Sequence, residues 1–267
     1  MFDLSSKKVI ITGGSGLVGS SLFNAIVSAG GVPIIFDLHE PSDPILANKI
    51  FEERKGYFWH CDITSEGSIL SCLNAVLEQF GEVDSLINNA AINPRFDGSI
   101  NKSHLENYLL ENWDRELSVG LTGAFLCTKH IGAAISKNKS GGVILNISSD
   151  LGLISPNQSL YFDDTKGADE QFKKPVSYSV VKSGLIGLTK YVATYWSDRN
   201  VRCNALCPGG IYQGQPERFV RKVQEHIPLG RMARTDEYGA TIVWMLSDEA
   251  EYLNGAIISM DGGRTAW

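Results

Sequence analysis

Residues 9–19, VIITGGSGLVG, decide how the rest of the chain is interpreted. Val9-Ile10-Ile11 is a β-branched run of the kind that forms a strand buried on both faces of a sheet. The glycine-rich sequence TGGSGLVG over Thr12–Gly19 follows, and apolar residues then recur at helical spacing from Leu17 to Ala29, before Gly30-Gly31. The stretch therefore predicts a strand, a tight turn and a helix.

The same alternation continues to the end of the chain. Further short apolar runs predict strands at 32–36, 57–60, 83–87, 142–147, 201–206 and 256–260. Stretches of helical length lie between them, at 65–80, 113–137, 177–198 and 236–247. About seven strands that alternate with helices predict an α/β fold, in which residues 1–267 form one Rossmann-type, doubly wound parallel sheet with helices on both faces.

Two polar stretches interrupt this alternation. Residues 93–109 include Arg95, Asn101, Lys102 and His104, and residues 153–175 carry seven charged side chains between Asp163 and Lys174. Loops of this length in a compact domain are usually functional or disordered. We expect both insertions to lie on the substrate side of the domain.

The composition excludes several classes of function. Of the 267 residues, 24 are Lys or Arg and 30 are Asp or Glu, a formal charge of −6 that leaves no basic face for nucleic acid. The chain contains no apolar run of about 18 residues, so we expect no membrane partner. The histidines show no spacing typical of metal ligands, so we expect no metal.

Cysteine usage and the first residues of the sequence indicate the compartment. The cysteines are odd in number, form no C-x-x-C pair and alternate with apolar residues, as buried free thiols do; they are Cys61, Cys72, Cys127, Cys203 and Cys207. The opening sequence lacks the apolar core and cleavage site of a signal peptide. These features predict a cytoplasmic protein.

The glycine-rich turn is suited to hold the pyrophosphate of a dinucleotide. Its glycines let the backbone approach the phosphates, and the N-terminus of the following helix offers free N–H groups and the positive end of a dipole. A turn with only a structural role is the alternative. Its place as the first turn between a strand and a helix, with an acid at a suitable distance, favours the dinucleotide.

That acid is Asp37, 18 residues after Gly19 and directly after the second predicted strand. Its carboxylate can accept hydrogen bonds from the adenosine ribose hydroxyls and would repel a 2′-phosphate. No Arg or Lys lies in the turn or just after Asp37, so the sequence predicts NAD rather than NADP. A helix cap or a solvated strand end would also explain this acid, and Asp62 either contacts adenine or caps the next helix.

Tyr178-Ser-Val-Val-Lys182 places a phenol and an ammonium on one face of a predicted helix. An ammonium near a phenol stabilises the phenolate and lowers the pKa of the tyrosine. Such a tyrosine can exchange a proton with an alcohol or a carbonyl. The spacing alone also arises by chance in many helices.

Further motifs surround this pair in a definite order. NNAA at 88–91, NISS at 146–149 and PGGI at 208–211 each follow a predicted strand, and MDGG occupies 260–263. Together with the glycine turn and the Y-x-x-x-K pair, these motifs resemble the classical short-chain dehydrogenase/reductase family along nearly the whole chain. The resemblance implies an oxidoreductase that transfers hydride between a substrate carbon and a nicotinamide cofactor.

The resemblance also implies roles for individual residues. Tyr178 is expected to be the general acid/base, Lys182 its partner and a ligand of the nicotinamide ribose, and Ser149 the residue that binds the reacting oxygen. The residues expected to contact the cofactor are Gly13, Ser15, Gly16, Leu17, Val18, Gly19, Asp37, Asp62, Ile63, Asn88, Ala90, Tyr178, Lys182, Pro208, Gly209 and Ile211. Helices within 113–137 and 177–195 are expected to pair between subunits, in a homodimer or homotetramer.

Three departures from the family pattern affect the interpretation. Gly120 stands where the family usually has an asparagine that relays protons, and the turn has the T-G-x-x-G-x-x-G spacing of the extended branch. Ser149 and Tyr178 are 29 positions apart instead of about a dozen. We interpret residues 153–175 as a substrate-side wall or lid in which Lys166, Lys173 or Lys174 faces an anionic or polyhydroxyl ligand. A solvated excursion or a subunit contact is the alternative.

The insertion favours a polar, sugar-type small-molecule substrate. SSDLGLISP at 148–156, PGGIY at 208–212 and the ending DGGRTAW resemble bacterial flagellin modification protein A-like members, which are associated with nonulosonic acid-type surface sugars. One alternative is a 3-oxoacyl or small-ketone reductase, which Asp37 disfavours because such enzymes usually use NADPH. An alternative of another class, supported by Gly120, is a non-catalytic NAD-binding sensor or scaffold.

Overall fold

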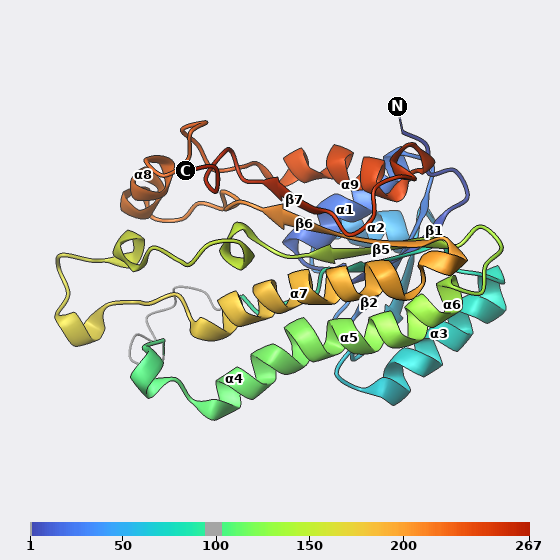
Figure 1. Cartoon of the computed structure of the whole chain (residues 1–267), viewed down its shortest axis with the longest axis horizontal. Helices are drawn as coiled ribbons and strands as arrows, with labels where there is room; N and C mark the ends of the chain where they lie inside the picture. Colours follow the sequence, from blue (N-terminus) through green and yellow to red (C-terminus); the bar gives the residue numbers. More distant parts are fainter. Residues whose placement is uncertain (1, 94–102) are drawn as a thin grey trace.

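The apolar runs predicted as strands form one parallel sheet. The computed structural model describes residues 2–93 and 103–267, and within them the sheet has the order β3-β2-β1-β4-β5-β6-β7. The strands are β1 (Lys8–Thr12), β2 (Val32–Asp37), β3 (Tyr57–His60), β4 (Ser85–Asn88), β5 (Gly142–Ile147), β6 (Val201–Pro208) and β7 (Ile257–Met260). The predicted Rossmann-type sheet is confirmed (Figure 1).

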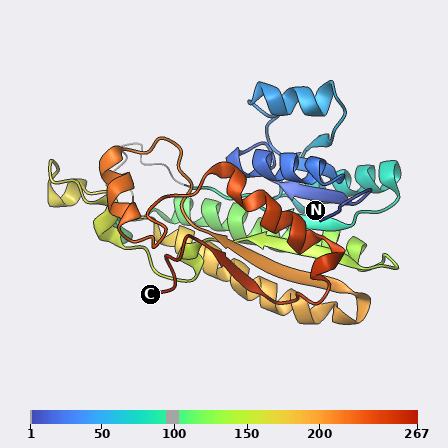
Figure 2. The ribbon, with the colours of Figure 1, turned by 90° about the horizontal axis from the view of Figure 1, so that it is seen from above.

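Helices cover both faces of this sheet (Figures 1 and 2). Six of the helices among the described residues are α1 (Leu17–Ser28), α2 (Pro44–Phe51), α3 (Glu66–Phe80), α7 (Val176–Tyr195), α8 (Glu217–Gln224) and α9 (Gly239–Leu246). The predicted helix 113–137 begins earlier, as α4 (Leu110–Leu117), and continues through α5 (Gly123–Cys127) and α6 (Ala133–Ile135) with π-helical turns between them. The short helices α2 and α8 were not predicted.

Two apolar cores explain why the strands are almost continuously hydrophobic. Val9 and Ile11 pack with α1, α2 and α9 on one face, whereas Ile10 packs with α3, α5 and α7 on the other. Each strand must therefore supply apolar side chains in both directions. The five cysteines are free and buried, as predicted.

The order of the strands creates a crevice beside β1. β1 pairs with β2 on one side and with β4 on the other, so the connections on the two sides of β1 run in opposite directions. In doubly wound sheets, ligands bind at this switch point, beyond the carboxyl ends of the strands. No helix in the part of the chain described here is long and apolar enough to span a membrane.

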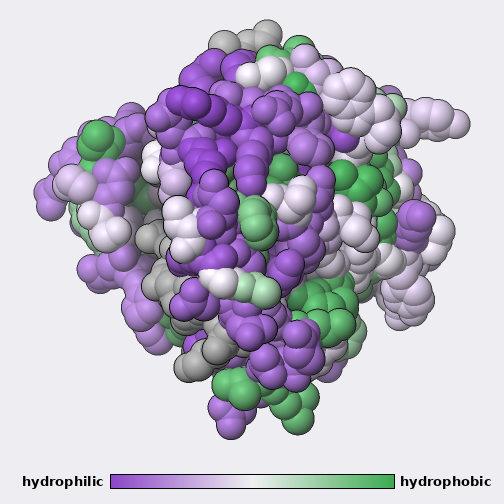
Figure 3. Space-filling model, turned by 90° about the vertical axis from the view of Figure 1, so that its left-hand side faces the viewer, coloured by the Kyte–Doolittle hydropathy of each residue, from purple (hydrophilic) through white to green (hydrophobic). Residues whose placement is uncertain are grey.

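The two insertions meet at the same end of the molecule. His104 Nε2 lies 2.6 Å from the Gln171 carbonyl, and the Lys173 N–H donates to Ser103 Oγ at 3.0 Å. Leu160 of the second insertion packs against Val223 in a small separate core beside α8. Figure 3 looks onto this end, where hydrophilic side chains dominate between separate apolar patches. Arg95, Asn101 and Lys102 lie outside the described residues.

Candidate active site

A cavity of about 1490 Å³ runs along the carboxyl ends of the strands. Residues just after six strands line it, namely Gly13, Leu38, Cys61, Asn89, Ser148 and Gly209. Pockets for single small molecules have volumes of about 300–1,000 Å³. The cavity therefore has room for a dinucleotide and a second ligand.

The structure brings all but one of the predicted site residues to this cavity. The residues that line it are Gly13, Ser15, Gly16, Leu17, Val18, Gly19, Asp37, Asp62, Ile63, Ala90, Ser149, Tyr178, Lys182, Pro208, Gly209 and Ile211. Sequence motifs from six separate strand ends therefore converge on one space. Among the described residues, no group of three or more His, Cys, Asp or Glu side chains could hold a metal ion.

The glycine turn fits a pyrophosphate. Gly13 has a φ of +63°, and a Cβ there would lie 2.8 Å from the Cα of Ala90. A Cβ at Gly19 would lie 2.5 Å from the Gly13 carbonyl oxygen. Helix α1 has no side-chain cap among the described residues and no acid in its first turn. Its first N–H groups therefore lack helical acceptors and are free for an anion at the cavity.

Asp37 is held in a fixed position at the adenosine end. Its carboxylate accepts hydrogen bonds from the backbone N–H groups of Ser15, at 3.0 Å, and His39, at 3.3 Å. The Ser15 hydroxyl donates to the His39 carbonyl at 2.8 Å and closes this loop. Asp62 accepts from the N–H and hydroxyl of Thr64, so it caps a local turn and also lines the cavity.

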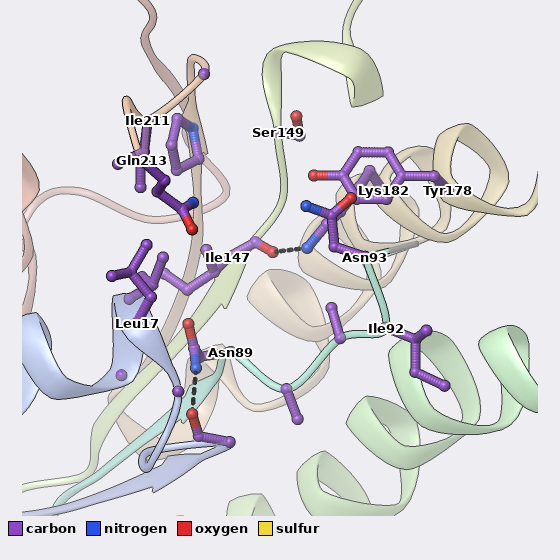
Figure 4. A pocket seen from close by; sticks show the side chains of 18 of the residues that line it. Leu17, Asn89, Ile92, Asn93, Ile147, Ser149, Tyr178, Lys182, Ile211 and Gln213 are labelled. Atoms are coloured by element: carbon purple, nitrogen blue, oxygen red, sulfur yellow. Dashed lines mark hydrogen bonds between the residues drawn. The ribbon is translucent and has the colours of Figure 1, made fainter. Parts of the chain in front are cut away.

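Asn88 is the predicted cofactor residue that the structure places elsewhere. Its side chain is buried beneath the cavity and donates to Asn146 Oδ1 at 2.8 Å and to Thr128 Oγ1 at 3.0 Å. Asn89 lines the cavity instead, and its Nδ2 donates to the carbonyls of Thr12 and Gly13 at 3.0 Å (Figure 4). The signal for Asn89 was present in the sequence, because ligands bind beyond the carboxyl ends of the strands and Asn89 is the first residue after β4.

Ser149, Tyr178 and Lys182 meet at the other end of the cavity (Figure 4). Ser149 is the second residue after β5, and Tyr178 and Lys182 lie on α7. Ser149 Oγ donates to Asp150 Oδ1 at 2.8 Å. Lys182 Nζ donates to the Ile147 carbonyl at 2.8 Å and lies 5.7 Å from the centroid of the Tyr178 ring. The three side chains border one space.

Burial has the largest effect on the proton affinities in this group. It raises the pKa of Tyr178, and a hydrogen bond with Ser149 opposes that rise. Burial and, to a smaller extent, the nearby Lys174 ammonium lower the pKa of Lys182 to about 8. The sequence predicted that Lys182 lowers the tyrosine pKa; the pKa is raised instead, because desolvation of the phenolate is the stronger effect.

Close helix packing leaves no space for a side chain at position 120. Gly120 is buried in the π-helical turn after α4, and a Cβ there would lie 2.6 Å from Val181 Cγ1 on α7. The glycine thus allows two helices to approach closely. One helical turn earlier, the buried Glu116 accepts a hydrogen bond from the Ser177 hydroxyl, which also lies 2.8 Å from the hydroxyl of Tyr108.

Comparison with known proteins shows the family to which the chain belongs. Residues 18–265 match the family model described as enoyl-(acyl carrier protein) reductase. The structure is similar to a short chain dehydrogenase from Leptospira borgpetersenii with bound NAD+, with a TM-score of 0.86 and 27% identity over 98% of this chain and 94% of that one. The chain belongs to the short-chain dehydrogenase/reductase family. It is an oxidoreductase that acts on CH–OH donors and uses a nicotinamide cofactor.

Two curated relatives show the range of this short-chain dehydrogenase/reductase group. The chain is 33% identical to a trans-4-hydroxycyclohexanecarboxylate dehydrogenase from Sinomonas cyclohexanicum, covering 98% of this chain and 94% of the relative. It is 28% identical to a D-threitol dehydrogenase from Mycolicibacterium smegmatis, covering 99% and 95%. Both relatives are named for secondary-alcohol substrates of different size and charge.

Proposed function

We propose that this short-chain dehydrogenase/reductase oxidises a polar secondary alcohol to a ketone, or reduces the ketone, with NAD as its cofactor. One observation carries the proposal. Ser149, Tyr178 and Lys182 line the same cavity as the open N-terminus of α1 and the Asp37 carboxylate. A dinucleotide held at one end would therefore extend toward a proton-transfer group at the other.

Each of the three residues has a task in this mechanism. In the oxidation, the Tyr178 phenolate takes the proton from the substrate hydroxyl, and in the reduction, the Tyr178 hydroxyl gives a proton to the carbonyl oxygen, while Ser149 hydrogen-bonds the same oxygen. Lys182 is buried, and its ammonium stabilises the Tyr178 phenolate, which exists before the proton is taken in the oxidation and after it is given in the reduction. Ile211 and Pro208, which line the cavity, would hold a nicotinamide cofactor, and that cofactor would supply the hydride acceptor.

The preference for NAD over NADP follows from Asp37. Two backbone N–H groups fix its carboxylate at the cavity, where it can accept from ribose hydroxyls. A 2′-phosphate placed there would meet a negative charge. The neighbouring Leu38, His39 and Glu40 that also line the cavity include no Arg or Lys to offset that repulsion.

A sugar-type substrate is supported by the polar groups at the reaction end. Asn93, Lys174, Gln213, Gln215 and Arg264 line the cavity there, beside the aromatic rings of Tyr161 and Phe172. Lys174 is the only one of the three insertion lysines singled out by sequence that lines the cavity among the described residues. The resemblance to surface-sugar enzymes points the same way, and activity on acyl thioesters or simple ketones instead would favour the reductase alternative.

We also propose that the enzyme is a cytoplasmic homodimer or homotetramer. Phe125 on α5 and Tyr191 and Tyr195 on α7 are 49%, 64% and 58% exposed. The rings of Tyr191 and Tyr195 stack on each other, and contiguous exposed apolar patches mark interaction surfaces. Light scattering on the purified chain would detect the assembly, and a monomer at micromolar concentration would contradict this part of the proposal.

The test of the proposed function is NAD reduction against sugars, sugar phosphates, nucleotide sugars, cyclitols and simple secondary alcohols. Turnover on a polar member, lost in Tyr178→Phe while calorimetric NAD binding remains, is the expected result. NAD binding without turnover on any member would favour the sensor alternative.

A further inference from the structure

Lys174 is a charged residue beside the reaction site for which the proposed mechanism has no use. It lies at the end of the insertion, one helical turn before Tyr178, and its Nζ lies 3.9 Å from the centroid of the Tyr178 ring. The side chain is half-buried at the cavity and donates a hydrogen bond to Asn93 Oδ1 at 2.7 Å. Its hydrogen-bond partner among the described residues is thus neutral.

The acids near Lys174 are already engaged by other groups. Asp150 Oδ2 lies 2.7 Å from the guanidinium of Arg264, and Asp150 Oδ1 accepts from the Ser149 hydroxyl. Glu116 accepts from Ser177. None of the ion pairs within residues 2–93 and 103–267 includes Lys174.

Among residues 2–93 and 103–267, positive charge therefore exceeds negative charge around the reacting groups. The groups that act on Lys174 or its neighbours are Tyr178 and Lys182 from α7, Glu116 from α4, Asp150 after β5 and Arg264 near the end of the chain. They and Lys174 comprise three cations and two carboxylates, in a chain whose formal charge is −6. Asp150 and Glu116 attract the Lys174 ammonium, but no carboxylate of the described residues pairs with it directly. A partly desolvated ammonium in that position is costly, and a bound anion would offset the cost.

We propose that the substrate carries an anionic group, a carboxylate or a phosphate, which Lys174 binds while a secondary alcohol of the same molecule lies at Tyr178 and Ser149. The proposal rests on the proposed function, since it assigns the alcohol to that site. Because Lys174 lies over the Tyr178 ring, the anionic group is close to the reacting carbon. The substrate is thus a hydroxy acid or a phosphorylated polyol rather than a neutral sugar.

The test uses two pairs of probes that differ in the anionic group. One pair is trans-4-hydroxycyclohexanecarboxylate and its carboxamide, and the other is sorbitol 6-phosphate and sorbitol. Calorimetry measures the binding of each to the enzyme–NAD complex. The anionic member of one pair should bind about tenfold or more tightly than its neutral partner, the range expected for a charge-assisted hydrogen bond. The pair that shows the preference distinguishes carboxylate from phosphate.

Three variants assign that preference to Lys174. Lys174→Met should abolish the anion preference, and Lys174→Arg should retain most of it. Lys173→Met is the matched control, because Lys173 is the adjacent lysine and is not among the described residues that line the cavity. NAD affinity should stay unchanged in all three variants, which also shows that they fold.

The pH dependence provides a second readout. Burial lowers the pKa of Lys174 to about 8, so its ammonium is present at neutral pH and is lost as the pH rises past that value. The affinity of the preferred anionic probe should therefore fall above pH 8 in the wild type, with a smaller fall in Lys174→Met, where Lys182 still titrates nearby.

Two results would overturn the inference. The first is no anion preference in either pair, including no binding of any probe, and the second is a preference that survives in Lys174→Met. NAD reduction by the same samples separates this inference from the proposed function. Equal turnover of charged and neutral members contradicts only the anionic substrate, whereas anion preference without turnover of any probe contradicts the dehydrogenase mechanism.

Discussion

The two ends of the cavity are built in different ways. The cofactor end comes largely from one continuous segment, in which β1, the glycine turn, α1 and β2 follow one another and end at Asp37. The reaction end joins residues that are far apart in the sequence, including Asn93, Asp150, Lys174 and Arg264. Local sequence can therefore specify the first end, whereas the second exists only once the whole sheet has formed.

The ends also differ in charge. Asp37, Glu40 and Asp62 line the adenosine end, whereas Lys174, Lys182 and Arg264 line the reaction end with Asp150, which pairs with Arg264. An acidic end accepts ribose hydroxyls and repels extra phosphate, while a basic end attracts negative charge on a substrate. Substitutions that affect one end and spare the other test this division directly.

The largest expected effect is at the reaction end. Tyr178→Phe removes the proton-transfer group, so kcat/KM should fall by about 10²–10⁴-fold, the usual contribution of general acid–base catalysis. NAD affinity measured by calorimetry should stay close to the wild-type value, because the phenol hydroxyl lies away from the adenosine end. Wild-type turnover by this variant would remove Tyr178 from the mechanism.

The matching change at the cofactor end is Asp37→Asn. It removes the charge that accepts ribose hydroxyls and repels phosphate, so NAD should bind about tenfold more weakly, as for the loss of one charge-assisted hydrogen bond. NADP should bind more tightly than it does to the wild type. Titration with each cofactor measures both changes, and an unaltered ratio of the two affinities would contradict the role of Asp37.

The contact between α7 and the helix at Gly120 can be tested by stability. Gly120→Ala would place a Cβ 2.6 Å from Val181 Cγ1, so we expect a loss of about 1–3 kcal/mol in the free energy of unfolding. Urea denaturation measures this loss. Adding Val181→Ala to the Gly120→Ala variant should recover part of the lost free energy of unfolding. A Gly120→Ala variant as stable as the wild type would show that the two helices can move apart without cost.

The smallest effect is expected where the insertion meets α8. Arg218 is exposed and pairs with Asp163 at 2.6 Å, which holds the insertion against α8. Because exposed ion pairs contribute about 0.2–1 kcal/mol, Arg218→Met should barely change overall stability. It should instead speed proteolysis within residues 153–175 and raise KM with NAD affinity unchanged. Unaltered proteolysis and KM would show that apolar packing alone holds the insertion.

The sequence predicted the sheet and most of the cofactor end because their signals are local. A β-branched run, a glycine turn and an acid at a strand end each act within a few residues of one another. For Asn88, the structure buries the side chain at the end of β4 and places Asn89, one residue later, at the cavity. Strand ends are set by pairing with neighbours, which a single segment does not reveal.

The reaction end was only partly predictable. Ser149, Tyr178 and Lys182 were predicted from their motifs. The sequence did not distinguish Lys174 from the other two lysines of the insertion, because its position depends on its contact with Asn93. Helix α8 was missed because its polar sequence has only Val223 fully buried, and its packing partner Leu160 lies in the insertion. The effect of burial on the Tyr178 pKa likewise depends on contacts made across the sheet.

The most direct test of the account is to follow the hydrogen itself. The enzyme would be incubated with NAD and a panel of polyols, sugar phosphates and hydroxy acids deuterated at the carbinol carbon, and the reduced cofactor analysed by mass spectrometry. The account predicts deuterium in NADH with at least one polar substrate in the wild type and none in Tyr178→Phe. Calorimetric NAD binding without label transfer from any member would contradict it.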